Sequence, residues 1–484
     1  MQAHGTMPVA WIHRPVGRWV AMARYFELVR HDGNRPLFSA LEISIISLLA
    51  GLPLHVHVEG LRGTGKTTIM RGAKDILPHI ERIKGCAYNC DPAAPHCPVH
   101  RNMTREEIAR TGTEWVKMPF LEISHSAKIG TVVGSIDLGR LVDPSMPEAA
   151  LLPGILPRAN RGIVFVDEIN RLADTSPELT DVLLDVMGTK PGRLQVEEVG
   201  FAAFEMPITL SVWGASNPDE EPGPLEDVRR QLSDRFDFLV TMGRPGEVDV
   251  VREILEIGVP ARWGKGMHDG VAVCEGAVGQ ADPALHYADL LASRSRDLPG
   301  VKFPSTLVSL LAQAYVDFGL ESLRAIEAMK LGALARATLE GRKEATVEDV
   351  KAIASLALRH RVDISTLTNI LKFLDEKAAN AREERETKVL AGGVAKEPTA
   401  PAEHGGSRGE GIERKGGSRS LSEAVGRLVC ALRRSLIGKS DTRGAGCPAG
   451  PGDYGTAGGW GAPQGDGTLQ QRGIRSGPGQ GGSR

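Results

Sequence analysis

Short, mostly apolar runs alternate with longer segments in which apolar residues recur every three or four positions. Runs of this kind predict buried strands at 54–58, 120–123, 163–166, 208–215 and 238–240. A helix is predicted after the third run, where Leu179, Val182, Leu183 and Val186 share one stripe. Because strands that alternate with helices are typical of a doubly wound parallel sheet, the predicted fold class is α/β.

The strand pattern fades after about residue 245, and helical spacing of apolar residues takes over at 250–257, 306–318, 321–339 and 347–360. Thr346 and Asp349 have the spacing of a capping box at the start of the last helix. Farther on, charged runs give way to Gly, Ser, Pro and Arg, a composition that buries too little apolar surface to fold. We predict an N-terminal extension, an α/β core, a smaller all-helical domain and a disordered tail, over 1–36, 37–245, 246–375 and 376–484.

Residues 60–67 match the phosphate-binding pattern G-x-x-x-x-G-K-[ST] at every position, between a predicted strand and a predicted helix. Glycines let such a loop curl around a polyphosphate, so that backbone N–H groups and the helix N-terminus face the negative charge. Lys66 would reach the β- and γ-phosphates of ATP, and Thr67 would hold Mg²⁺. The residues expected to bind the nucleotide are Gly60, Gly63, Thr64, Gly65, Lys66, Thr67 and Thr68.

Two further segments carry the polar groups that hydrolysis requires. The predicted strand 163–166 ends in Asp167 and Glu168, where one carboxylate can hold Mg²⁺ and the next can orient the attacking water. The alternative is a solvated turn after a strand. Asn217 follows the fourth predicted strand, and its amide can bond a γ-phosphate oxygen and that water. Its alternative is a turn-forming Asn-Pro pair.

Several segments together resemble the AAA+ ATPase subunit I of magnesium chelatase. They are 134–137, 151–156, 159–162, 166–170 and 231–236, and the similarity extends over about residues 38–362. The resemblance implies an AAA+ core with a helical lid, working as a ring, expected to be a hexamer. It also implies that Arg235 is an arginine finger, inserted into the site of the neighbouring subunit, and that Arg324 is a second sensing arginine. Residues 192–205 resemble the inserted hairpin of the family.

By this resemblance, ATP hydrolysis would drive metal insertion into a tetrapyrrole, or MoxR-like remodelling of a partner protein. In the family, a second subunit carries a metal-ion-dependent adhesion domain and a third binds the porphyrin. The sequence contains no D-x-S-x-S signature, so these partners would be separate chains.

A Cys- and Pro-rich segment contains Cys86, Cys90, Cys97 and His100 with the spacing C-x₃-C-x₆-C-x₂-H. Three thiolates and an imidazole suit tetrahedral Zn²⁺. His96 competes as the fourth ligand, and an iron–sulfur cluster or three unliganded thiols are the alternatives. The magnesium chelatase resemblance does not require this cluster.

The charge balance and the cysteine content make some classes of function less favoured. Lys and Arg number 58 against 60 Asp and Glu, so the net charge of −2 provides no general attraction to nucleic acid or to an anionic membrane. Six cysteines in 484 residues and no long apolar run predict a cytoplasmic protein without a membrane span. A DNA-acting AAA+ remodeller or helicase is the second hypothesis, which salt-sensitive DNA binding would support. A nucleotide-gated scaffold is the third, and Glu168 with Arg235 argues against it.

Overall fold

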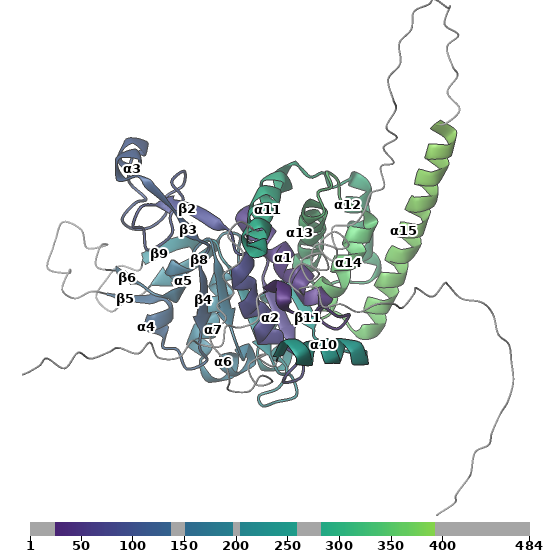
Figure 1. Cartoon of the computed structure of the whole chain (residues 1–484), viewed down its shortest axis with the longest axis horizontal. Helices are drawn as coiled ribbons and strands as arrows, with labels where there is room; N and C mark the ends of the chain where they lie inside the picture. The colour runs from purple at the N-terminus through teal and green to yellow at the C-terminus, as the bar shows by residue number, and fades with distance from the viewer. Residues whose placement is uncertain (1–24, 137–150, 197–203, 259–281, 393–484) are drawn as a thin grey trace, which may run out of the picture. The chain divides into compact units, whose positions relative to one another are not determined.

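The computed structural model describes residues 25–136, 151–196, 204–258 and 282–392. A five-stranded sheet, in which each pair of neighbouring strands is parallel, forms the centre of the core (Figure 1). In spatial order its strands are β11 (Phe238–Thr241), β1 (Val56–Glu59), β10 (Ser211–Ser216), β7 (Ile163–Val166) and β4 (Phe120–Ile123). The predicted α/β class with a parallel sheet is confirmed.

The central strands are buried on both faces, as their nearly continuous apolar runs predict. In β7, Ile163 and Phe165 pack into the hydrophobic cluster that also contains residues of α1 (Arg35–Leu49) and of the C-terminal helices. Val164 and Val166 face the other way, into a cluster with the cysteine-rich segment. The alternation follows from the two-residue period of a strand.

Short helices connect the strands of the core. They are α2 (Lys66–Gly72), α3 (Arg105–Thr111), α4 (Ile129–Val132), α5 (Ile155–Arg158), α6 (Ile169–Thr175), α7 (Pro177–Val186), α8 (Leu225–Val228) and α9 (Arg230–Arg235), with the 3₁₀ turns η1 (Tyr25–Glu27) and η2 (Ala73–Ile76). The stripe predicted on α7 is confirmed, because Leu179, Leu183 and Val186 are buried and Val182 is partly buried against the same cluster.

Among the described residues, three antiparallel pairs stand outside the main sheet. They are β2 (His79–Ile83) with β3 (Thr113–Lys117), β5 (Gly134–Ile136) with β6 (Leu151–Pro153), and β8 (Gly192–Val196) with β9 (Phe204–Ile208). The last pair is the hairpin expected at 192–205. It corrects the predicted fourth strand at 208–215, because Ile208 pairs with Gly192 in the hairpin and β10 begins at Ser211.

The helical domain follows the core and is labelled α10 to α15 in Figure 1. Its elements are α10 (Val248–Gly258), α11 (Pro283–Asp297), η4 (Leu298–Gly300), α12 (Ser305–Asp317), α13 (Leu323–Leu339), α14 (Val347–Leu358) and α15 (Ile364–Gly392). The capping box of Thr346 and Asp349 is present at the start of α14. Helices α13 and α14 pack against α1 and β11, so the domain lies beside the β11 edge of the sheet.

The two outer boundaries differ from those expected. Residues 25–36, expected in the extension, pack onto the core: Tyr25 is fully buried and its hydroxyl donates to Glu42 Oε1 at 2.8 Å. At the other boundary, α15 continues past residue 375 with Ala378 buried. The rest of the expected extension and the tail from residue 393 lie outside the described residues. No described helix combines the length and apolar character needed to cross a membrane.

Candidate functional site

The phosphate-binding loop connects β1 to α2 at the carboxyl edge of the parallel sheet. Gly63 and Gly65 have φ angles of 75° and 86°, in the left-handed region that favours glycine. Gly65 is also the N-cap of α2, so Lys66, Thr67 and Thr68 form the first turn of the helix. The helix N-terminus is therefore directed at the loop, as a phosphate site requires.

Lys66 lies with its ammonium group among oxygen acceptors. It donates to the carbonyls of Gly60 and Leu61, the latter at 2.8 Å, and to Asn217 Oδ1 at 2.8 Å. Burial lowers the pKa of Lys66, and the carboxylate of Asp167 acts in the opposite direction. The lysine and the expected sensing asparagine thus meet at one point, although they follow different strands.

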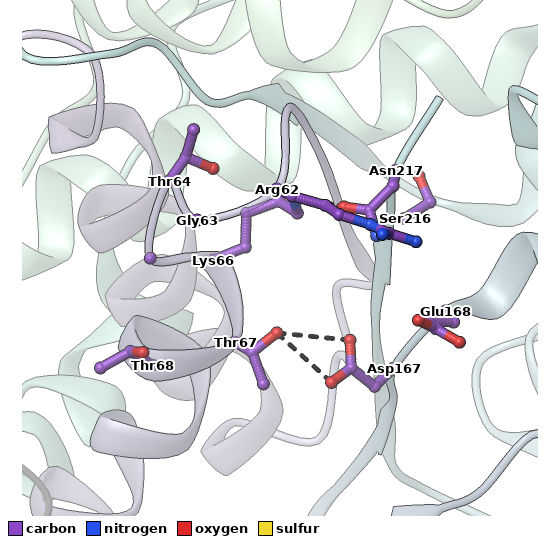
Figure 2. A pocket seen from close by; sticks show the side chains of 11 residues that line it. Arg62, Gly63, Thr64, Lys66, Thr67, Thr68, Asp167, Glu168, Ser216 and Asn217 are labelled. Atoms are coloured by element: carbon purple, nitrogen blue, oxygen red, sulfur yellow. Dashed lines mark hydrogen bonds between the residues drawn. The ribbon is translucent and has the colours of Figure 1, made fainter. Parts of the chain in front are cut away.

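The two residues expected to hold Mg²⁺ also meet. Thr67 Oγ1 lies 3.3 Å from each carboxylate oxygen of Asp167, and Figure 2 shows the two side chains facing each other across the pocket. A hydroxyl and a carboxylate provide the oxygen ligands that Mg²⁺ prefers. This donor set fits the ion that accompanies ATP.

Glu168 begins α6 in an uncommon backbone conformation, with φ 52° and ψ 48°. The left-handed region is costly for a residue with a Cβ atom and is found at functional sites more often than elsewhere. A chain of ion pairs holds the carboxylate: Arg171 lies 3.5 Å from both Glu168 and Glu220, and Glu220 pairs with Arg62 of the phosphate loop. No sequence signal identified Arg171 or Glu220.

A cavity of about 340 Å³ lies between these elements. It is lined by Arg62, Gly63, Thr64, Gly65, Lys66, Thr67, Thr68, Asp167, Glu168, Ser216 and Asn217. The cavity is lined by every residue that was expected to bind or hydrolyse the nucleotide within one chain, except Gly60. The carbonyl of Gly60 accepts a hydrogen bond from Lys66. Arg62 and Ser216 were missed by the sequence analysis, since variable motif positions and a strand-end serine carry no distinctive pattern.

The two expected arginines do not line this cavity. Instead they lie together where the core meets the helical domain. Arg324 donates to the carbonyl of Gly188 at 2.8 Å, and Arg235 donates to the same oxygen at 3.4 Å. Burial lowers the pKa of Arg235, and the positive charge of Arg324 lowers it further. Two cations therefore share one neutral acceptor, between the end of α9 and the start of α13.

Neighbouring contacts hold this pair in place. Arg361, just after α14, bonds the Asp234 carboxylate at 3.0 Å and the carbonyl of Phe236 at 2.8 Å. These bonds tie the helical domain to the residues on either side of Arg235. The position of Arg235 therefore depends on the docking of the helical domain.

The cysteine-rich segment forms a separate cluster. The ligand atoms of Cys86, Cys90, Cys97 and His100 all lie within 4.8 Å of one another. None of these residues lines the cavity at Lys66.

Comparison with known proteins gives consistent results. A model of the AAA lid domain matches residues 308–377. The 38 kDa subunit of magnesium chelatase from Acidiphilium rubrum is 34% identical over 333 residues, which are 68% of this chain and 88% of that protein.

A second sequence relative matches over a similar length. The magnesium-chelatase subunit ChlI of Nephroselmis olivacea is 31% identical over 341 residues, covering 70% and 89% of the two chains. A solved structure of the complex between subunits BchI and BchD of magnesium chelatase matches with 26% identity and a TM-score of 0.36, covering 72% of this chain and 98% of that chain. From the sequence relatives, the chain belongs to the family of the magnesium chelatase ATPase subunit, the AAA+ ATPase subunit I.

Proposed function

We propose that this ATPase works as a ring of identical subunits, in which two adjacent protomers build each active site. The observation that carries the proposal is the location of Arg235 and Arg324: they lie side by side but do not line the cavity at Lys66 of their own chain. A ring provides the geometry in which they meet a nucleotide, that of the next protomer. A hexamer is the ring size we expect.

Within one protomer, the roles follow from the chemistry of the cavity. Lys66 and the N-terminus of α2 would bind the phosphates, and Thr67 with Asp167 would hold Mg²⁺. When bound, Mg²⁺ would neutralise part of the negative charge of the phosphates. Glu168 would orient the attacking water and accept its proton, while Asn217 would sense the γ-phosphate.

The neighbouring protomer would supply the remaining charge. Arg235 would neutralise the negative charge that develops on the transferring phosphoryl group, because a guanidinium presents several donors in a rigid plane. Arg324 would bond the same phosphates as a second cation. Hydrolysis then depends on assembly, since in an isolated protomer neither arginine reaches the nucleotide bound at Lys66.

We propose that the work done by this motor is metal insertion into a tetrapyrrole, with MoxR-like remodelling of a partner protein as the alternative. The relatives named as magnesium-chelatase subunits support the first task. The partners would be a subunit with a metal-ion-dependent adhesion domain and a porphyrin-binding subunit.

The test combines the purified chain with the two other chelatase subunits, a free-base porphyrin, Mg²⁺ and ATP. The change in porphyrin fluorescence on metal insertion is the readout. We expect insertion that requires this chain and disappears with Glu168→Gln. ATP turnover without any insertion would leave the motor intact and reject the tetrapyrrole as its substrate.

A further inference from the structure

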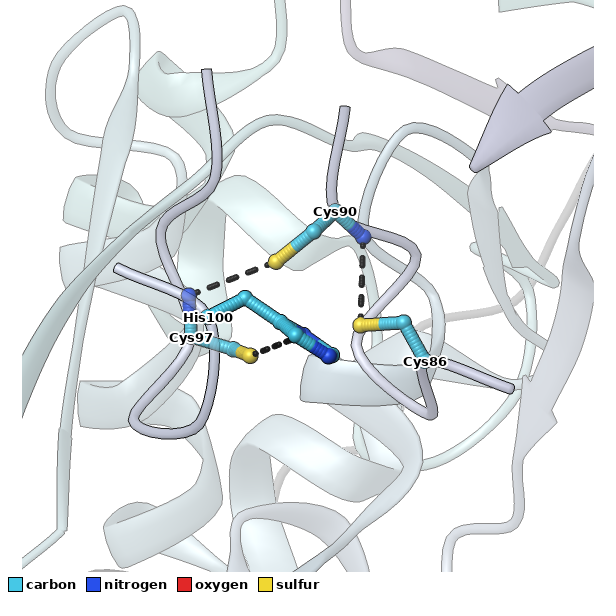
Figure 3. Close-up of side chains that lie close together, drawn as sticks. All are labelled: Cys86, Cys90, Cys97 and His100. Carbon is cyan, nitrogen blue, oxygen red and sulfur yellow. Dashed lines mark hydrogen bonds between the residues drawn. The ribbon is translucent and has the colours of Figure 1, made fainter. Parts of the chain in front are cut away.

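The cysteine cluster lies in a compact, folded part of the core. Cys86, Cys90 and Cys97 are between 0% and 2% exposed, and His100 is 9% exposed. Figure 3 shows the four side chains converging from two turns of the segment between β2 and α3. Buried thiols pack there with apolar residues such as Ile108 and Leu156. The four groups are thus gathered by the fold.

The spacing of the ligand atoms matches the size of one ion. A tetrahedral Zn²⁺ with Zn–S bonds of about 2.3 Å places its sulfur ligands roughly 3.8 Å apart, and all four ligand atoms here lie within 4.8 Å of one another. An iron–sulfur cluster inserts several iron atoms between its thiolates and needs a wider ligand cage. We propose that Cys86, Cys90, Cys97 and His100 bind one structural Zn²⁺ ion.

Backbone donors around the sulfurs support this assignment. The N–H of Cys90 donates to Cys86 Sγ at 3.5 Å. The N–H groups of His96 and Cys97 both donate to Cys90 Sγ at 3.4 Å. Such bonds stabilise the negative charge of a metal-bound thiolate and orient it, as the outer partners of metal ligands do. Two of the three sulfurs therefore already have their surrounding donors in place.

The structure also distinguishes between the two candidate histidines. His100 Nδ1 lies 3.1 Å from Cys97 Sγ, and His100 belongs to the group of four. His96 Nδ1 lies 3.3 Å from Cys90 Sγ, but His96 does not belong to the group, and it lines a separate cavity with Arg161. We assign the fourth ligand to His100.

The ion would stabilise the cysteine-rich segment, which contacts residues 158–161 just before β7. Asn89 Nδ2, between two of the ligands, donates to the carbonyl of Arg158 at 2.7 Å. In return, Asn160 Nδ2 donates to the carbonyl of Tyr88 at 3.2 Å, and Arg161 pairs with Asp91 at 3.2 Å. The strand that follows ends at the site carboxylates. The ion would thus help to position β7 through these contacts, and it would take no part in ATP hydrolysis.

Metal analysis of the purified full chain tests the proposal directly. After gel filtration in a buffer without added metal, mass spectrometry should find about one zinc per chain. Replacement by Co²⁺ should produce the intense visible bands of tetrahedral thiolate coordination. Zinc far below one equivalent, or iron with acid-labile sulfide in its place, would overturn the assignment.

Variants locate the ion. Cys97→Ser and His100→Ala should each lower the zinc content at least several-fold and should lower the melting temperature. Cys274→Ser and His96→Ala are the matched controls and should retain full zinc. Full zinc in Cys97→Ser would reject the site, and loss in His96→Ala with retention in His100→Ala would reject the assigned histidine. Should Cys97→Ser not fold, the cobalt spectrum of the wild-type chain decides.

The proposal is independent of the nucleotide site. Lys66→Ala lies outside the cluster and should retain one zinc per chain while nucleotide binding is lost. If the chain does not bind zinc, the ATPase assignment is not affected. If the chain does not bind ATP, the zinc result is not affected.

Discussion

Arg235 and Arg324 donate to the same oxygen, the carbonyl of Gly188, although one belongs to the core and the other to the helical domain. The two positive charges repel each other. Burial and the charge of Arg324 both lower the pKa of Arg235, so its charged form is less stable than in water. A phosphate group placed between them would relieve both effects. Under the proposed function, the pair would receive a phosphate group of the nucleotide bound to the neighbouring protomer.

Arg235→Ala should bind ATP with near-normal affinity and hydrolyse it on the order of 10³-fold more slowly, because an arginine finger acts on the transition state. Steady-state ATP turnover and equilibrium binding of a fluorescent nucleotide measure the two effects. Arg230→Ala is the matched control, since that arginine lies on the same helix with a side chain that is 85% exposed. Its turnover should stay within a few-fold of wild type.

Mixing tests whether the site is shared. Glu168→Gln subunits carry an intact finger, and Arg235→Ala subunits carry an intact water-orienting carboxylate. If the finger acts between protomers, mixed rings should recover part of the turnover that either variant lacks alone. Arg324→Ala should be rescued in the same way, because it lies beside Arg235. Absence of recovery at every mixing ratio would show that the site is complete within one chain.

Lys66→Ala should abolish nucleotide binding, raising the dissociation constant on the order of 100-fold or more, because it removes the buried cation that faces the phosphates. Isothermal titration with ATP measures the loss. Lys343→Ala replaces an exposed lysine of the helical domain and should bind ATP like wild type. Unchanged affinity of Lys66→Ala would refute the phosphate-loop assignment.

Two substitutions at Asn217 should have different effects. Asn217→Ala removes the amide that would sense the γ-phosphate, so turnover should fall on the order of 100-fold while ATP affinity changes little. Asn217→Asp places a carboxylate 2.8 Å from Lys66, where it would pair with the lysine and repel the phosphate. ATP affinity should therefore fall at least tenfold in Asn217→Asp. Equal affinities of the two variants would contradict the placement of this residue at the phosphate.

Stability should fall as the pH decreases from 7 to 5. Burial lowers the pKa of His57 to about 3 and that of His55 to about 4, from an ordinary value near 6.5. The unfolded chain takes up these protons below pH 6.5, whereas the folded chain does so only near pH 3 to 4. Each histidine then costs roughly 2 kcal/mol of unfolding free energy at pH 5.

Urea denaturation at the two pH values measures this cost. His57→Gln should reduce the difference in unfolding free energy between pH 7 and pH 5, because its ring no longer titrates in the unfolded chain. His125→Gln replaces an exposed histidine and is the matched control. An equal pH dependence in wild type and His57→Gln would contradict the prediction.

Local features of the chain were predictable because neighbouring residues form them. The phosphate loop needs only its own glycines and the helix that follows, and the capping box of Thr346 and Asp349 needs only residues three positions apart. Four of the five described strands of the sheet, β1, β7, β10 and β11, were found for a related reason, since a strand that is mostly buried has a recognisable apolar run. The error at Ile208 occurred where a hairpin strand and a sheet strand follow each other closely.

Contacts between distant segments were decided by the tertiary structure alone. The hydrogen bond between Lys66 and Asn217 forms because β1 and β10 are neighbours in the sheet. No local sequence pattern predicts the order of strands in a sheet. The ion pair of Glu220 with Arg171 likewise joins residues about fifty positions apart. The position of Arg324 beside Arg235 depends on the docking of the helical domain. The sequence by itself therefore determined which groups are present, and packing between distant segments determined which of them meet.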